Sequence, residues 1–212
     1  MRDDINPLVD YAEALSGPVP DYLLRLERET FLKTLAPQMM CSRLQGRVLA
    51  LLSKLQRPNR ILEIGTFTGY SALCLAEGLP SNGELHTIEG NLEMAFIAEQ
   101  FFLASPFANQ IKLHTNKADT VINELEGNFD LIFLDADKRN YTHYFEHLID
   151  RLHSGGLFLS DNVLWDGRVV DHDDKDPDVR ALATYNQLLA EDSRVELLLL
   201  PLRDGLSIAR KR

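Results

Sequence analysis

The feature that most constrains this chain is a regular alternation, from residue 60 to the end, of short apolar runs with amphipathic helical patterns. Short apolar runs separated by helices are typical of βαβ units, so they predict an α/β fold with a mostly parallel sheet. The expected strands cover residues 60–64, 84–89, 111–115, 129–135, 156–161, 195–200 and 206–210; the helices between them cover residues 71–77, 92–103, 120–125, 141–152 and 178–190.

The last two expected strands have no helix between them. Only the short turn 201–205 joins them, and it ends in Asp204-Gly205, a dipeptide that favours a hairpin. A hairpin reverses the direction of the chain, so we expect the final strand to run antiparallel to its neighbours. The sequence therefore predicts a seven-stranded, mostly parallel sheet with an antiparallel last strand and helices on both faces.

Residues 20–56 precede the first strand and carry helical apolar patterns. A chain of 212 residues buries about 70% of its unfolded surface, so it needs no disulfide or metal to fold. We expect one domain over residues 1–212, with a helical N-terminal cap at 1–56 and an α/β core at 57–212. Cys41 and Cys74 form no CxxC pair, and we interpret them as reduced, buried thiols.

The first expected strand leads into a loop with Gly65 and Gly69 and then into a helix that begins near Ser71. Ligands of open α/β sheets bind beyond the carboxyl ends of the strands, where a glycine lets them approach the backbone. Glu89 ends the next strand, where an acid can accept hydrogen bonds from both hydroxyls of a ribose. The loop has the pattern GxxxG and lacks the GxGxxG of a dinucleotide site, which favours S-adenosylmethionine (SAM) over NAD.

A second group of polar residues follows the fourth and fifth strands. Asp135 ends the fourth strand and Lys138 follows it, while Asp161 ends the fifth strand and Asn162 follows it. Neighbouring parallel strands would bring these side chains together at the same sheet edge as the Gly65 loop. Carboxylate and amide oxygens suit Mg²⁺, Mn²⁺ or Ca²⁺. A metal beside a phenol lowers the pKa of that phenol, and Lys138 would then accept its proton.

These motifs closely resemble those of the cation-dependent class I SAM O-methyltransferases, which include the catechol, caffeoyl-CoA and bacterial-type enzymes. The resemblance runs through the whole chain in family order, and LDADK followed by SDNVL is its most specific part. The segments that carry it are LEIGTFTGYSAL (62–73), HTIEGN (86–91), FDLIFLDADKRNY (129–141), LSDNVLW (159–165) and DGLSIARK (204–211).

The resemblance implies a role for each matching residue. Asp135, Asp161 and Asn162 match the family's metal ligands, Mg²⁺ foremost, and Lys138 with Asp135 matches its catalytic residues. Glu89 matches the acid that holds the ribose of SAM. The other positions that match the cofactor pocket are Met40, Glu63, Gly65, Ser71, Ala118 and Asp135.

The same resemblance implies a Rossmann-like fold and a reaction. The methyl group of SAM would pass to a metal-bound hydroxyl of a vicinal diol, with alignment of the two reactants supplying much of the rate. Residues 164–178 resemble the substrate-shaping insertion of bacterial and plant members, which favours a phenylpropanoid-type or other small catechol as acceptor. The family also implies a homodimer.

Composition excludes several partners. The net charge of −10 disfavours nonspecific binding to nucleic acids or anionic membranes. No apolar run approaches the length of a membrane span, and residues 1–4 lack the apolar segment of a signal peptide. We expect a cytoplasmic protein whose partners are small molecules and a second copy of itself.

Four other functions fit the sequence less well. Asp135-Ala136-Asp137 copies the DxD signature of a metal-dependent phosphatase, but that chemistry needs the pair after the first strand, and Gly65 and Glu89 would have no role. An NAD-dependent oxidoreductase lacks its glycine pattern here. A non-catalytic nucleoside-binding module would not need Lys138 and three metal ligands. Methylation of RNA conflicts with the acidic charge.

Overall fold

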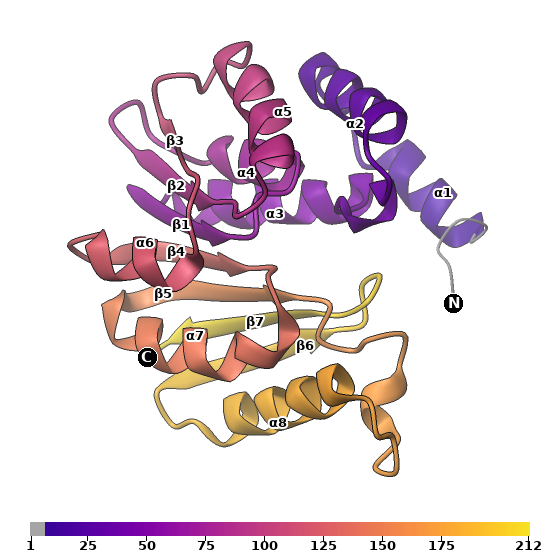
Figure 1. Cartoon of the computed structure of the whole chain (residues 1–212), viewed down its shortest axis with the longest axis vertical. Helices are drawn as coiled ribbons and strands as arrows, with labels where there is room; N and C mark the ends of the chain where they lie inside the picture. Colours follow the sequence, from indigo (N-terminus) through magenta and orange to yellow (C-terminus); the bar gives the residue numbers. More distant parts are fainter. Residues whose placement is uncertain (1–6) are drawn as a thin grey trace.

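The computed structural model describes residues 7–212, so the prediction about residues 1–4 lies outside the described part. Its centre is one seven-stranded sheet with the strand order β3-β2-β1-β4-β5-β7-β6, seen in Figure 1. The strands are β1 (Arg60–Ile64), β2 (Glu84–Ile88), β3 (Ile111–His114), β4 (Phe129–Leu134), β5 (Leu152–Asp161), β6 (Val195–Leu200) and β7 (Leu206–Lys211).

The direction of the strands confirms the predicted fold class. β3, β2, β1, β4 and β5 pair in parallel, and β7 runs antiparallel to both β5 and β6. The strand order reverses beside β1, because the chain first adds β2 and β3 on one side and then β4 and β5 on the other. Such a switch point leaves a crevice at the carboxyl ends of the two strands that flank it.

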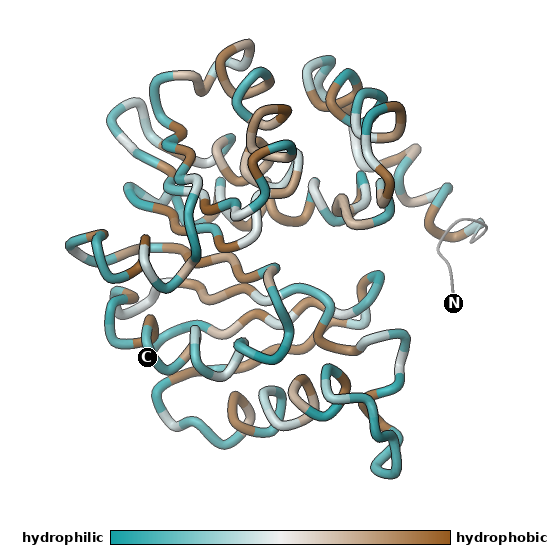
Figure 2. The backbone as a smooth tube through the Cα atoms, viewed as in Figure 1, coloured by the Kyte–Doolittle hydropathy of each residue, from teal (hydrophilic) through white to brown (hydrophobic). Residues whose placement is uncertain are grey.

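Helices cover both faces of the sheet, as predicted. α3 (Arg43–Gln56), α4 (Tyr70–Ala76) and α5 (Leu92–Leu103) share one buried cluster with the sheet, and α6 (Ala118–Glu124), α7 (Tyr141–Leu148) and α8 (Pro177–Glu191) share the other. Much of the apolar sequence lies in the central strands and the helix faces toward them, whereas the loop before α8 is hydrophilic (Figure 2).

The N-terminal region forms three helices before the first strand. α2 (Asp21–Lys33) and α3 lie where the apolar patterns predict helices, and α1 (Pro7–Leu15) has no buried residue. At the start of α3, the Ser42 side chain accepts a hydrogen bond from the Gln45 backbone amide at 3.2 Å, which satisfies an amide that the helix leaves free. A short 3₁₀ turn, η2 (Pro37–Met39), joins α2 to α3.

The structure differs from the sequence prediction after α7. A single helix was expected over 141–152, but α7 ends at Leu148, a 3₁₀ turn η4 (Ile149–Arg151) follows, and β5 begins at Leu152. The physical reason is tertiary. Lys211 Nζ lies 2.8 Å from the carbonyl oxygen of Ile149 and 2.7 Å from that of Leu152, and Arg151 donates to the carbonyls that precede β4.

Candidate active site

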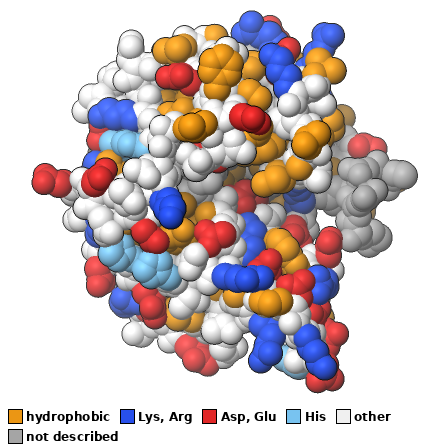
Figure 3. All heavy atoms as spheres, viewed as in Figure 1, with side chains coloured by type: hydrophobic (Ala, Val, Ile, Leu, Met, Phe, Trp, Pro, Cys, Tyr) orange, Lys and Arg blue, Asp and Glu red, His pale blue; other side chains and the backbone are white. Residues whose placement is uncertain are grey.

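A cleft of about 1270 Å³ opens at the carboxyl ends of β1, β2 and β4. It exceeds the ~300–1,000 Å³ of a typical small-molecule site, so it has room for two ligands. Figure 3 shows this face, with acidic and basic side chains between the upper and lower halves of the molecule. The lining includes Met39, Gly65, Phe67, Glu89, Ala118, Asp135, Asp137, Lys138, Tyr144, Asn162, Trp165, Arg203 and Asp204.

Gly65 lets the chain pass tightly between two strand ends at the floor of the cleft. Its φ of +100° suits glycine, and a Cβ atom there would come within 1.8 Å of the carbonyl oxygen of Asp135. The Gly65 amide donates to the carbonyl of Ile88 at 3.1 Å, which ties the loop to the end of β2. The glycine therefore holds the ends of β1, β2 and β4 together around the cleft.

Glu89 lies immediately after β2 with both carboxylate oxygens facing backbone amides. The Phe67 amide donates to Oε2 at 2.7 Å, and the Asn91 amide donates to Oε1 at 2.8 Å. These bonds fix the carboxylate, and each oxygen keeps a lone pair because an ionised carboxylate has about four acceptor sites. Glu89 therefore presents two fixed acceptors to the cleft, the arrangement that a pair of ribose hydroxyls requires.

Asp135, Asn162 and Lys138 meet at the other end of the cleft. β4 and β5 pair in parallel with Leu134 opposite Ser160, so the residues that follow each strand lie side by side. Lys138 Nζ donates to Asp135 Oδ1 and to Asn162 Oδ1, each at 2.8 Å. Asn162 has a φ of +56°, a left-handed conformation that is costly outside glycine and is often found at functional sites.

Asp161 lies beneath this group and is 1% exposed. The Asn162 amide donates to its Oδ1 at 2.8 Å. Burial raises the pKa of the Asp161 carboxyl well above its ordinary value, and the charge of Asp135 raises it further, while Lys138 and Gln45 lower it. Two carboxylates thus share one lysine, so the site has more negative than positive charge. Asp161 does not line the cleft itself.

The prediction placed Glu63 and Ser71 in the cofactor pocket, and the structure places both behind the cleft wall. Glu63 is fully buried, and Thr87 and Ser71 donate hydrogen bonds to its carboxyl. Burial nevertheless raises the pKa of Glu63 to about 8, and the charges of Asp135 and Glu89 add to the rise. Glu63 is therefore a buried acid whose hydrogen-bond donors, Thr87 and Ser71, are neutral.

Met40 and Ala118 were also predicted in the cofactor pocket. Ala118, the first residue of α6, lines the cleft. Met40 is 9% exposed, and its neighbour Met39 lines the cleft instead. Arg203 holds this segment from the opposite end of the chain, since its Nη1 donates to the carbonyl of Met40 at 2.7 Å.

Sequence reasoning missed several lining residues. Phe67 and Asp137 lie inside recognised motifs, so the motif spacing itself was an available signal. Arg203 and Asp204 line the cleft from the β6–β7 turn, where the sequence signals were the hairpin dipeptide and the family segment that begins at Asp204. Burial raises the pKa of Asp204, which also accepts a hydrogen bond from the Asp166 amide.

Asp135 and Asp137 do not act as a pair. The Asp137 carboxylate accepts hydrogen bonds from the Tyr144 hydroxyl, at 3.0 Å, and from the side-chain Nδ2 of Asn140, whereas Asp135 accepts from Lys138. The pair also follows β4, the fourth strand along the chain. This arrangement gives no support to the phosphatase alternative.

The oxygen donors at this end fit a divalent cation by their chemistry. The Lys138 ammonium already bridges Asp135 and Asn162 as a cation would, and the charge of Asp135 adds to the effect of burial in raising the pKa of Asp161. Among residues 7–212, no three His, Cys, Asp or Glu side chains gather as a metal site. The candidate set contains two carboxylates and takes its third oxygen from the Asn162 amide.

Comparison with known proteins gives consistent matches. The family model described as "O-methyltransferase" matches residues 13–212. The catechol O-methyltransferase of Niastella koreensis is 33% identical over 99% of both chains. The caffeoyl-CoA O-methyltransferase of Populus kitakamiensis is 35% identical over 79% of this chain and 76% of its own. The O-methyltransferase TomG from Streptomyces achromogenes, solved in complex with SAM, has a TM-score of 0.90 at 30% identity, covering 97% of this chain and 96% of TomG.

Proposed function

The chain belongs to the O-methyltransferase family, and we propose that it moves the methyl group of SAM to a hydroxyl of a small catechol-like acceptor with the help of a divalent cation. One observation carries the proposal: a single cleft contains the fixed Glu89 carboxylate at one end and the Asp135–Lys138–Asn162 group at the other. The Glu89 carboxylate can accept hydrogen bonds from the ribose hydroxyls of a nucleoside. The Asp135–Lys138–Asn162 group can bind the hydroxyl of an acceptor.

The charge balance of the cleft favours SAM as methyl donor. Glu63, Glu89 and Asp135 lie in or behind its wall, and burial raises the pKa of Glu63. SAM carries a positive sulfonium and a positive amino group, which would compensate such acids. The TomG complex with SAM, at 30% identity over nearly the whole chain, supports the same cofactor.

Asp135, Asp161 and Asn162 would hold the cation, and we propose Mg²⁺ because all three donors are hard oxygens. A divalent cation held there would draw the acceptor oxygen close and lower the pKa of its hydroxyl. Lys138 Nζ, which lies 2.8 Å from both Asp135 and Asn162, would in its neutral amine form accept the hydroxyl proton, and the ammonium formed in this way would hold the phenolate oxygen. In the transfer step the oxygen–carbon bond forms as the sulfur–carbon bond breaks.

Orientation is the main contribution of the protein to this reaction. Glu89 would fix the ribose end of SAM, and Asp135 and Lys138 would fix the acceptor oxygen. Trp165 lines the acceptor end, where an indole can pack against an aromatic ring. Holding two reactants in line contributes about 7–11 kcal/mol to lowering a bimolecular barrier. The relatives named for catechol and caffeoyl-CoA support a catechol-type acceptor.

A homodimer and a cytoplasmic location remain predictions. Phe31 and Leu32 on α2 and Phe96 on α5 are exposed apolar side chains, and they favour a second copy as their partner. Sedimentation equilibrium on the purified protein would test the dimer. Among residues 7–212, the structure contains no helix with the length and apolar character that a membrane crossing requires.

The decisive experiment incubates the purified protein with SAM and a panel of small catechols, once with Mg²⁺ and once with EDTA. We expect mass spectrometry to detect one added methyl group that disappears with EDTA and returns with excess Mg²⁺. A methylated product that persists in EDTA would overturn the proposed cation dependence but not the proposed methyl transfer. Absence of SAM binding by isothermal titration calorimetry would overturn the proposal as a whole.

A further inference from the structure

The Lys138 ammonium uses all three of its hydrogens in this structure. Its Nζ lies 2.8 Å from Asp135 Oδ1, 2.8 Å from Asn162 Oδ1 and 2.7 Å from the Tyr141 hydroxyl oxygen. An ammonium group has three N–H donors, so none is left for an acceptor molecule. Two of the three contacts are with oxygens that the proposed cation also needs, so Lys138 and that cation compete for the same oxygens.

The third contact, with Tyr141, involves no oxygen of the proposed cation set. Tyr141 is the first residue of α7 and is fully buried. Its hydroxyl donates to the carbonyl oxygen of Asp161 at 3.0 Å and accepts from Lys138. Its ring packs edge-on against that of Tyr185, with centroids 5.4 Å apart. The fold therefore fixes this phenol independently of any ligand in the cleft.

We propose that Tyr141 is a positioning residue for Lys138: its hydroxyl keeps the Lys138 nitrogen beside the acceptor when a divalent cation takes the oxygens of Asp135 and Asn162. The inference rests on the proposed function and deepens it. Without a cation, Lys138 substitutes for it. With a cation bound, Lys138 loses its hydrogen bonds to Asp135 and Asn162 and keeps the one to Tyr141. The free side of its nitrogen then faces the acceptor hydroxyl.

This arrangement has an electrostatic cost that a variant would reveal. Tyr141 holds a positive group next to a divalent cation, and like charges a few ångströms apart repel. A lysine without this tether would swing away into the cleft, which would relieve the repulsion. Tyr141→Phe should therefore bind the cation more tightly and yet turn over more slowly. A merely structural loss at the site would weaken cation binding instead.

The test measures Mn²⁺ affinity from the electron paramagnetic resonance signal of free Mn²⁺. We expect Tyr141→Phe to bind Mn²⁺ about threefold more tightly than the wild type, and Lys138→Met about tenfold, because the competing charge is gone. In Lys138→Met protein, adding Tyr141→Phe should change nothing further. With Mg²⁺ and a catechol, Tyr141→Phe should lower kcat about tenfold or more and leave the KM for SAM unchanged.

Tyr185→Phe is the matched control. Tyr185 is also a fully buried tyrosine, and its hydroxyl bonds to Ser160 Oγ at 2.6 Å, away from Lys138. It should leave Mn²⁺ affinity and kcat unchanged. Weaker Mn²⁺ binding by Tyr141→Phe, or an effect that persists without Lys138, would overturn the inference alone. If Tyr141→Phe fails to fold, the Lys138→Met variant decides the question. If Lys138→Met does not bind Mn²⁺ more tightly than the wild type, Lys138 and the cation do not compete and the inference is overturned. A wild type that binds no Mn²⁺ overturns the proposed cation chemistry as well.

Discussion

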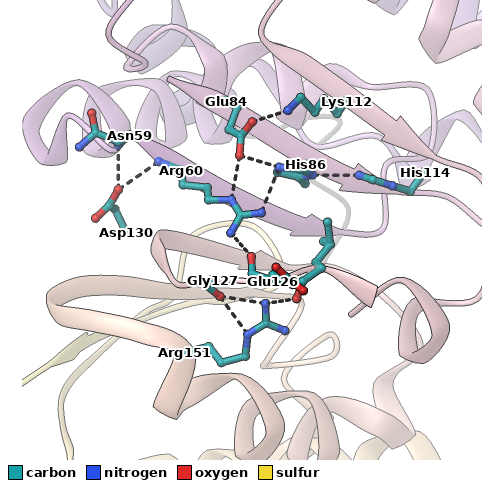
Figure 4. A network of polar contacts seen from close by, with 11 residues as sticks. Asn59, Arg60, Glu84, His86, Lys112, His114, Glu126, Gly127, Asp130 and Arg151 are labelled. Carbon is teal, nitrogen blue, oxygen red and sulfur yellow. Dashed lines mark hydrogen bonds and ion pairs between the residues drawn. The ribbon is translucent and has the colours of Figure 1, made fainter. Parts of the chain in front are cut away.

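The acids at the two ends of the strands differ in their pKa values: those at the amino ends have ion-pair partners that lower the pKa, and those at the carboxyl ends have a pKa that burial raises. At the amino ends of the strands, Glu84 pairs with Arg60 Nε at 2.9 Å, with His86 at 3.0 Å and with Lys112, as Figure 4 shows. The hydrogen bonds from Lys112 and His86 lower the pKa of Glu84 to about 2. At the carboxyl ends, burial raises the pKa of Glu63 to about 8 and raises that of Asp161 as well.

The same balance extends through the rest of the amino-end network. Asp130 accepts from the amides of Asn59 and Arg60 and pairs with His153 at 2.8 Å, and these contacts lower its pKa against the effect of burial. Arg151 donates to three backbone carbonyls. A network that satisfies its own charges stabilises the fold. Buried acids whose pKa stays raised despite their hydrogen bonds favour instead a site for cations from outside.

The largest effect is expected at the carboxyl ends. Asp161→Ala should lower the rate of methyl transfer about 10³-fold, because the proposed cation would lose a ligand and with it several kcal/mol of charge stabilisation. SAM affinity, measured by isothermal titration calorimetry, should stay within about threefold of the wild type, since Asp161 lies outside the cleft lining. Equal loss of both would contradict the assigned role. Asp130→Asn, at the opposite edge, is the control and should leave the rate unchanged.

Glu89→Gln should weaken SAM binding about 10- to 100-fold, because hydrogen bonds to a charged acceptor contribute about 1.5–3 kcal/mol. Isothermal titration calorimetry gives the affinity directly. Glu93 lines the same cleft but lacks the backbone hydrogen bonds that fix the Glu89 carboxylate, so Glu93→Gln is the control. Its affinity for SAM should match that of the wild type. If both variants lose affinity alike, general charge attraction and not a ribose contact would explain the result.

Glu63→Gln should stabilise the ligand-free protein in a pH-dependent way. The pKa of Glu63 is raised from 4.5 to about 8, so its stabilising protonated form is present at low pH and is lost as pH rises through this range. The Tm of the variant should equal that of the wild type near pH 4.5 and exceed it by roughly 10 °C at pH 8.5. A difference in Tm that does not change with pH would count against a raised pKa.

The smallest effect is expected from Glu84→Gln. The pKa of Glu84 is lowered to about 2, so its contribution is complete above pH 4.5 and is lost as pH falls toward 2. Because the side chain is 31% exposed, solvent screening limits the loss to about 1 kcal/mol in the free energy of unfolding at pH 7. Urea denaturation at pH 7 and pH 3 measures it, and methyl transfer should not change. A variant that lost activity would contradict the separation of the two edges.

Much of the fold and of the site was predictable because the signals are local. β1, β6 and α5 begin and end at the residues that the apolar runs predict. The hairpin dipeptide Asp204-Gly205 correctly predicted the antiparallel β7. The proximity of Asp135 and Asn162 was also predicted correctly, because residues at the carboxyl ends of neighbouring parallel strands lie at the same edge of the sheet. The roles assigned to these residues stay predictions.

Only the tertiary structure decided which of these side chains face the cleft and what their charges do. Glu63 and Asp161 are not among the residues that line the cleft. Met39 lines it and Met40 does not, and Arg203, far away in the sequence, donates a hydrogen bond to the Met40 carbonyl. A sequence pattern specifies the period of a strand and the residues at its end. Burial and the sum of neighbouring charges depend on every element that packs around them, and these set the pKa values that separate the two edges.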